Sequence, residues 1–134
     1  MIAARRWSGP ILAVAGGLLI GGSMPPIGIW PLAIVGLVLV ERAVAGSAMP
    51  ERFRRGWFAG VAVLAPTTWW MRELTLPGWI IASLVLGAML GLALAAVPPH
   101  SGRWLAFPSG WVLFEAIRSR WPFGGVPLST LAVG

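Results

Sequence analysis

The amino-acid sequence predicts an all-α integral membrane protein, a bundle of about five transmembrane helices whose N-terminus lies in the cytoplasm. Of its 134 residues, 57% are hydrophobic and only 10% are charged, and the mean hydropathy is +0.83. Soluble domains carry roughly 25% charged residues, so this composition indicates a lipid environment. Short turn and charge signals divide the apolar sequence into segments of a length that suits helices crossing a bilayer.

The proline, glycine and charged residues between the apolar segments predict where the helices begin and end. The turn at 24–28 contains Pro25, Pro26 and Gly28, so we expect a helical hairpin on either side of it. A charged stretch at 46–55 and a Pro/Gly-rich stretch at 98–102 are interpreted as loops. The whole chain, 1–134, is then a single transmembrane domain, with helices at about 7–23, 30–45, 56–72, 77–97 and 104–121.

The individual segments differ in how clearly they predict a crossing. The fourth has some twenty residues without a charge, enough for ~30 Å of hydrocarbon. The third contains Pro66, which should kink the helix, and Thr67 and Thr68 could satisfy the freed backbone groups. The first follows Arg5 and Arg6, a pattern that a signal peptide shares. We favour a helix because more apolar segments follow and no A-x-A cleavage site does.

The positions of the arginines predict which side of the membrane each loop faces. The formal net charge is +6, and every basic residue is Arg. Topology setting and contact with anionic lipid explain this charge better than nucleic-acid binding does, because the arginines lie between apolar segments. With the N-terminus inside, the cytoplasmic side would hold Arg5, Arg6, Arg42, Arg52, Arg54, Arg55 and Arg103, and the outer side Arg72, Arg118 and Arg120, as the positive-inside rule requires.

One stretch, 104–125, combines an apolar helix with ionisable residues. Glu115 and Arg118 are three apart, so on a helix they share a face and can pair. An ion pair within a membrane is expensive unless it faces protein or water, which makes the pair a functional-site hypothesis. The alternative is that the pair marks where the helix leaves the bilayer, with Arg118 and Arg120 snorkelling to the head groups.

The residues give no complete active site. The chain has no cysteine, lysine or aspartate, which excludes disulfides, thiolate metal sites, a Ser/His/Asp triad and a Lys-containing phosphate loop. His100 is the only histidine and has no partner at metal-ligand spacing. We therefore expect no catalytic residue, metal or cofactor in this chain.

Three G-x-x-x-G spacings occur, and each could let two helices approach closely. They are Gly17/Gly21, Gly56/Gly60 and Gly87/Gly91. With 18 glycines in 134 residues, chance alone gives roughly two such spacings, so the motif is weak evidence by itself.

Three stretches in order resemble the N-terminal membrane region of bacterial apolipoprotein N-acyltransferase. They are 24–40, with a P-x-G-x-W-P turn, 55–77, with a Trp-rich helix exit, and 107–134. In the last, the family form P-x-x-W-x-x-x-E-x-x-R followed by a G-[FV]-P turn is supplied by Pro108, Trp111, Glu115, Arg118, Gly125 and Pro127.

The resemblance implies a multi-pass protein of the bacterial cytoplasmic (inner) membrane. The family transfers an acyl chain from phospholipid to the N-terminal S-diacylglyceryl cysteine of a lipoprotein precursor. The acyl group passes through a thioester on a cysteine of an extracytoplasmic nitrilase-like domain, whose glutamate and lysine assist. Because this chain lacks Cys and Lys, none of those catalytic residues maps onto it. We expect it to be truncated at the C-terminus and inactive alone.

What can be carried over is the membrane half. The resemblance places Trp111, Glu115, Arg118 and Trp121 at a lipid entrance near the outer leaflet, with structural helix-to-domain pairing as the alternative. Three interpretations stay open. The chain could be a fragment or split gene that needs a separately encoded nitrilase-like domain. It could be a stand-alone membrane scaffold, for example an anchor for a glycosyltransferase such as a polyprenol-phosphate mannose synthase. It could also be an unrelated small transporter subunit with Glu115 in a pore.

Overall fold

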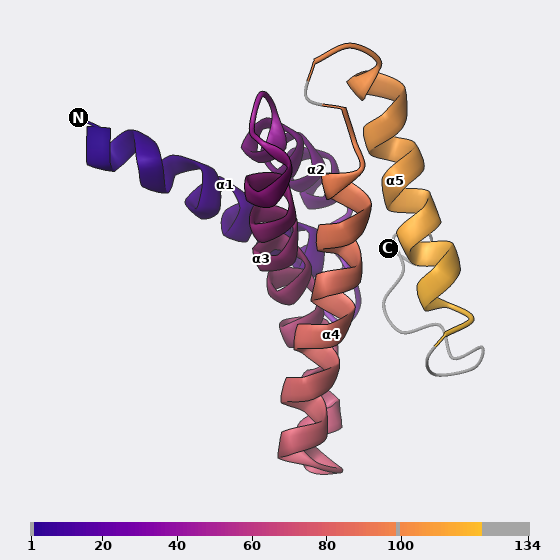
Figure 1. Ribbon diagram of the computed structural model, residues 1–134. Helices are drawn as coiled ribbons and strands as arrows, with labels where there is room; N and C mark the ends of the chain where they lie inside the picture. The colour runs from indigo at the N-terminus through magenta and orange to yellow at the C-terminus, as the bar shows by residue number, and fades with distance from the viewer. Residues whose placement is uncertain (1, 99, 122–134) are drawn as a thin grey trace.

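The computed structural model describes residues 2–98 and 100–121, with side chains from Ser8 onward. Over this part of the chain the fold is entirely helical and contains no strand (Figure 1), which confirms the predicted all-α class. The elements are α1 (Ile2–Ser23), α2 (Pro31–Val44), α3 (Met49–Thr67), the short 3₁₀ helix η1 (Trp69–Glu73), α4 (Leu76–Ala95) and α5 (Arg103–Arg118).

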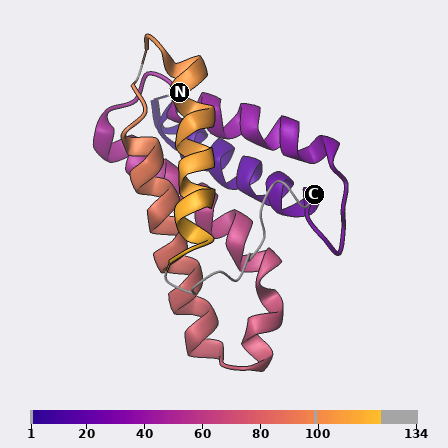
Figure 2. The same ribbon diagram turned by 90° about the vertical axis from the view of Figure 1, so that its right-hand side faces the viewer.

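The helices form two groups. α1 and α2 make the hairpin that the Pro25-Pro26 turn predicts, and this hairpin is inclined to α4 and α5, as Figure 2 shows. α3 packs most extensively against α4 and also contacts α1, so it joins the two groups. α5 packs mainly along α4 and contacts the other helices much less. One face of α5 is therefore left uncovered by the other described helices.

The glycine spacings lie at the closest helix contacts. Gly60 faces Gly87, so that a Cβ added at Gly60 would lie 2.7 Å from the Cα of Gly87. Gly56 faces Gly91 in the same way, at 3.0 Å. Because α3 and α4 run antiparallel, two G-x-x-x-G motifs meet residue by residue, and the backbones touch without intervening side chains. The third motif also lies at an interface, since a Cβ on Gly17 would collide with the carbonyl oxygen of Ala59.

The start of α3 corrects the predicted loop at 46–55. The helix begins at Met49, so the charged residues from Glu51 to Arg55 lie on its first turns rather than in a loop. The local sequence suits a helix start. Pro50 lies in the first turn of α3, where a backbone N–H has no partner within the helix, so the missing N–H of proline loses no hydrogen bond. Glu51 places a negative charge in the same turn. The loop prediction was wrong because it relied on the many charged residues of this stretch and not on these helix-start signals.

The other end of α3 comes directly after Pro66. The helix ends at Thr67 and the chain continues into η1, so the predicted kink is a helix end. The hydroxyl groups of Thr67 and Thr68 donate to the carbonyls of Val63 and Leu64, at 2.8 Å and 2.6 Å. The carbonyl that Pro66 leaves without its usual amide belongs to Ala62, four residues earlier, so these threonines do not satisfy it.

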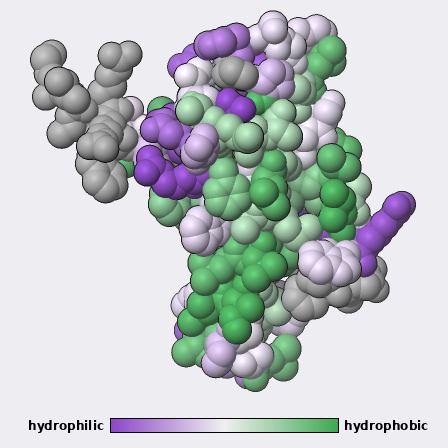
Figure 3. Space-filling model, viewed as in Figure 1, coloured by the Kyte–Doolittle hydropathy of each residue, from purple (hydrophilic) through white to green (hydrophobic). Residues whose placement is uncertain are grey.

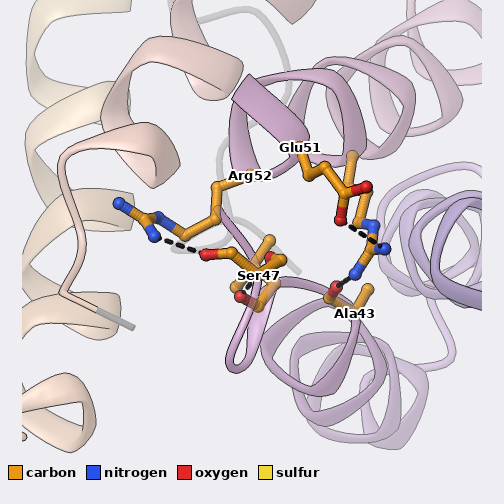
Figure 4. A network of polar contacts seen from close by, with 6 residues as sticks. Ala43, Ser47, Glu51 and Arg52 are labelled. Atoms are coloured by element: carbon orange, nitrogen blue, oxygen red, sulfur yellow. Dashed lines mark hydrogen bonds and ion pairs between the residues drawn. The ribbon is translucent and has the colours of Figure 1, made fainter. Parts of the chain in front are cut away.

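Arg52 ties the α2–α3 connection and the end of α4 to the start of α3. Its side chain is only 8% exposed. One guanidinium nitrogen donates to the carbonyl of Ser47 at 2.6 Å and the other to the carbonyl of Ala95, the last residue of α4, at 2.9 Å. Figure 4 shows Arg52 pointing toward the chain at Ser47. Arg52 is therefore a buried bridge between two connections of the fold.

Arg55 makes the second bridge of this kind. It donates to the carbonyl of Ala43, in the last turn of α2, at 2.6 Å, and pairs with Glu51 at 2.9 Å (Figure 4). A cation at a helix C-terminus interacts favourably with the exposed carbonyls there. Two of the arginines predicted to set topology thus also hold helix ends together.

Among the described helices, α4 alone is long and apolar enough to cross a membrane by length and composition. The stretch Ser8–Ser23 of α1 is apolar but shorter. Large apolar side chains are nevertheless exposed on every α-helix, and Figure 3 shows hydrophobic residues over much of one face of the molecule. Such extensive apolar exposure exceeds what soluble monomers carry in one patch.

Candidate functional site

The candidate site residues lie on and just beyond α5. The helix begins after Gly102, whose φ of +73° turns the chain, and it ends at Arg118. Its buried face consists of Phe107, Trp111, Phe114 and Arg118. These positions recur every three or four residues, the spacing of one helical face, and they pack toward the core that α4 shares.

The four predicted site residues do not share one environment. Trp111 is 4% exposed and Arg118 is 3% exposed, so both belong to the buried face. Glu115 is half-buried, and Trp121 is 61% exposed beyond the end of the helix. The structure therefore brings Trp111, Glu115 and Arg118 together on α5 and leaves Trp121 at the surface.

Glu115 and Arg118 lie one turn apart on α5, where Glu115 is half-buried and Arg118 is buried. The guanidinium carbon of Arg118 lies 5.5 Å from the ring centre of Phe114. Snorkelling to head groups requires an exposed side chain, which Arg118 is not, whereas Arg120 is exposed. Arg118 thus has a buried, protein-facing position in this fold.

A groove of 510 Å³ runs between α2 and α5, and Glu115 stands at one end of it. Its middle is apolar, formed by two residues of α2 and by the outward turns of α5. The lining residues are Leu37, Val38, Glu41, Arg103, Trp104, Phe107, Pro108, Trp111, Val112 and Glu115. From Arg103 to Glu115 the helix rises about 18 Å, at 1.5 Å per residue. The lining therefore extends along most of α5 and is mainly apolar, with ionisable groups near both ends of the helix.

The end opposite Glu115 contains an ion pair that sequence reasoning missed. Arg103, the first residue of α5, donates through Nε to the carboxylate of Glu41 near the end of α2. Both side chains are half-buried. Glu41 is followed directly by Arg42 in the sequence, a position that does not single it out as a partner for Arg103. Because the two residues are 62 apart in the sequence, no local pattern links them.

The groove has few chemically reactive side chains in its wall. Its ionisable groups are two carboxylates and one guanidinium, and its wall can contain no thiol or amine nucleophile because the sequence has no Cys or Lys. No group of three His, Cys, Asp or Glu side chains able to hold a metal occurs among the described residues. The indole N–H of Trp111 is buried with no hydrogen-bond acceptor in the part of the chain that the structure describes.

Comparison with known proteins agrees with the resemblance in the sequence. Residues 16–134 match the family model described as the apolipoprotein N-acyltransferase N-terminal domain. The apolipoprotein N-acyltransferase of Caulobacter vibrioides is 34% identical over 85% of this chain and 25% of its own length. Those of Azotobacter vinelandii and Pseudomonas paraeruginosa are 30% and 29% identical, each over 90% of this chain and 27% of their own length.

The chain thus spans about a quarter of the length of the curated relatives that it matches. No solved structure matches it. The family model covers nearly all of the chain, including α2 to α5 and the groove between α2 and α5. The chain therefore belongs to the apolipoprotein N-acyltransferase family and corresponds to its N-terminal domain.

Proposed function

We propose that this chain is the membrane-embedded N-terminal part of an apolipoprotein N-acyltransferase, and that it is inactive alone. The observation that carries the proposal is the family match over residues 16–134. The complete enzyme would take an acyl chain from a membrane phospholipid and transfer it to the N-terminal S-diacylglyceryl cysteine of a lipoprotein precursor. A thioester mechanism needs a cysteine nucleophile, which this chain lacks.

We place the chain in the bacterial cytoplasmic membrane as a bundle of five crossings with its N-terminus inside. The contacts of Arg52 support this topology, because they join the α2–α3 and α4–α5 connections at one end of the fold. Arg55 and Arg103 lie at the same end, which the positive-inside rule assigns to the cytoplasm. Apolar side chains exposed on every α-helix would then face lipid or further protein.

The role proposed for α5 is to shape the lipid entrance on the outer side. Glu115 stands at the outer end of the groove and interacts with the buried Arg118, while Trp121 lies exposed beyond the helix, as an interfacial residue would. The pair would fix the end of α5 where an incoming lipid passes toward the extracytoplasmic catalytic domain.

Complementation tests the domain assignment. In cells depleted of the acyltransferase, we expect rescue when this chain is expressed together with a separate nitrilase-like domain from a relative, and no rescue by either piece alone. The readout is growth together with the fraction of lipoprotein that carries the third acyl chain. Failure of the combination, with both proteins shown to be in the membrane, would favour a scaffold or glycosyltransferase anchor. Rescue by this chain alone would contradict the mechanism.

The ion pair can be tested in the same two-piece system. Arg118→Ala is expected to lower lipoprotein acylation by about one to two orders of magnitude, because it leaves the end of α5 and the lipid entrance mispositioned. Arg72→Ala is the matched control, since it removes an exposed arginine of η1 that does not line the groove. If the two variants support equal acylation at equal protein levels, the role of Glu115 and Arg118 is structural only.

A further inference from the structure

We propose that the ion pair between Arg103 and Glu41 is a latch, which holds the start of α5 against α2, and that α5 tilts away from α2 when the pair separates. This conformational switch goes beyond the proposed function and needs neither acyl transfer nor a bound ligand. It follows from three features of the fold: the limited packing of α5 on α4, the space around the start of α5, and the solvent exposure of the ion pair.

α5 has a limited contact with α4 near its own middle. α3 covers α4 far more extensively than α5 does. Gly110 of α5 lies against Ala93 and Val97 of α4, where an added Cβ would be 3.5 Å and 3.4 Å from its neighbours. The two helices therefore meet at Gly110 without a tight backbone contact, so a small tilt about this point brings no backbone atoms into collision.

The chain just before α5 can follow such a tilt. Gly102 precedes the helix with a φ of +73°, and a Cβ added to it would meet nothing within 4 Å. Glycine adopts a wide range of backbone angles because it has no Cβ, so Gly102 can act as the hinge. Leu105 lies outside the groove lining and is exposed in the part of the chain that the structure describes. The start of α5 therefore has room to move outward.

On the side of α2, the ion pair crosses a space rather than a packed interface. The groove separates α2 from α5 over most of the length of α5, and the two helices approach each other at few points. The side chains of Arg103 and Glu41 are 26% and 28% exposed. Water and salt ions reach a pair with this exposure, so its attraction is partly screened and the pair can separate and re-form. Separation would widen the groove at this end.

A modest tilt gives a measurable movement. Arg103 lies about 10 Å from Gly110 along the helix, at 1.5 Å per residue, so a tilt of about 20° moves it by about 4 Å. Phe107 is nearer to Gly110, about 4.5 Å away, and moves by only about 1.5 Å. A side-chain rotation absorbs a shift of this size, so the buried aromatic face of α5 stays on α4 while the start of the helix moves.

Spin-label distances test the latch in the purified chain in detergent micelles. The sequence contains no cysteine, so an added pair of cysteines carries both labels without background. Val35→Cys on α2 and Leu105→Cys on α5 use exposed positions outside the groove lining. Glu41→Arg or Arg103→Glu alone places like charges together and should lengthen the distance between the labels by about 4 Å. The double reversal restores opposite charges and should restore the short distance.

Arg42→Glu is the matched control, because it reverses an exposed charge next to Glu41 and leaves the ion pair intact. It should leave the distance between α2 and α5 unchanged. A second label pair, Phe58→Cys on α3 and Leu92→Cys on α4, reports whether a variant keeps the packing of these helices. With that reference distance unchanged, single reversals that do not lengthen the distance between α2 and α5, or a double reversal that does not restore it, would overturn the proposal.

Two further measurements keep the ion pair intact. Raising the salt from about 0.05 M to about 1 M shortens the Debye length to about 3 Å, so the population with a long distance from Val35 to Leu105 should grow. No growth would overturn the latch even if a reversal variant fails to fold. Moving the second label to Leu113, on the other side of Gly110, should reduce the change to below about 2 Å. An equal change at both positions would show that α5 moves as a whole and would overturn the tilt about Gly110.

Discussion

Gly60→Ala is expected to lower the free energy of unfolding by about 1–3 kcal/mol, although it adds a single methyl group. The added Cβ would lie 2.7 Å from the Cα and 2.8 Å from the carbonyl oxygen of Gly87. Both are backbone atoms, which cannot rotate away as a flexible side chain can. The only response is a separation of α3 from α4, the most extensive helix pair of the fold. Gly60→Leu should be worse still.

The same substitution at Gly110 is the control. Gly110 lies within α5, and its added Cβ would be 3.4 Å from a side-chain carbon of Val97, which is ordinary contact. Alanine is the better helix former, so Gly110→Ala should be neutral or stabilise the fold by up to about 1 kcal/mol. The measurement is the midpoint of thermal unfolding in detergent micelles. Two substitutions of equal sign would contradict the close contact between α3 and α4.

These glycines also show what the sequence could and could not predict. Apolar segments and the Pro/Gly turns between them were enough to predict an all-α fold, because lipid-compatible composition leaves few alternatives. The G-x-x-x-G spacing did not say which helices meet. Gly56 and Gly60 form a close helix contact only because the antiparallel helix α4 places Gly91 and Gly87 opposite them. That arrangement depends on tertiary packing.

The charged residues were harder to interpret for the same reason. Local spacing predicts that Glu115 and Arg118 lie near one face of α5, because three residues along a helix bring side chains close together. Spacing along one helix says nothing of which neighbour covers that face, so the burial of Arg118 could not be predicted. The pair Arg103–Glu41 joins residues 62 apart in the sequence, beyond the reach of any local pattern.

The groove likewise depends on how helices far apart in the sequence pack together. Val38 and Pro108 lie in two separate apolar segments of the sequence, and no local pattern connects them. They line one groove because α5 packs along α4 and leaves a space between itself and α2. The Arg103–Glu41 ion pair lies at one end of that groove. The resemblance named Trp111 and Glu115 as candidates, whereas nothing in the sequence named the α2 residues that line the groove with them.

Arg52→Met is expected to lower the free energy of unfolding by about 3 kcal/mol. The reason is that two hydrogen bonds from a charged donor are lost, each contributing about 1.5–3 kcal/mol, and methionine fills only part of the space. The carbonyls of Ser47 and Ala95 lose this donor. Arg52→Lys should recover only part of the stability, since an ammonium group lacks the planar fork that reaches two carbonyls at once.

Arg54→Met separates this structural role from the effect of charge on topology. Arg54 is exposed on the same turn of α3, so its substitution removes the same formal charge from the same side of the membrane. It should change the free energy of unfolding by less than about 0.5 kcal/mol. Thermal unfolding in micelles, paired with cysteine accessibility at an added N-terminal cysteine, measures stability and orientation together. If both variants unfold alike, the arginines of α3 act only as topology signals. If only Arg52→Met is destabilised and neither variant inverts, a residue that sequence rules assign to orientation in fact holds the α2–α3 connection and the end of α4 to the start of α3.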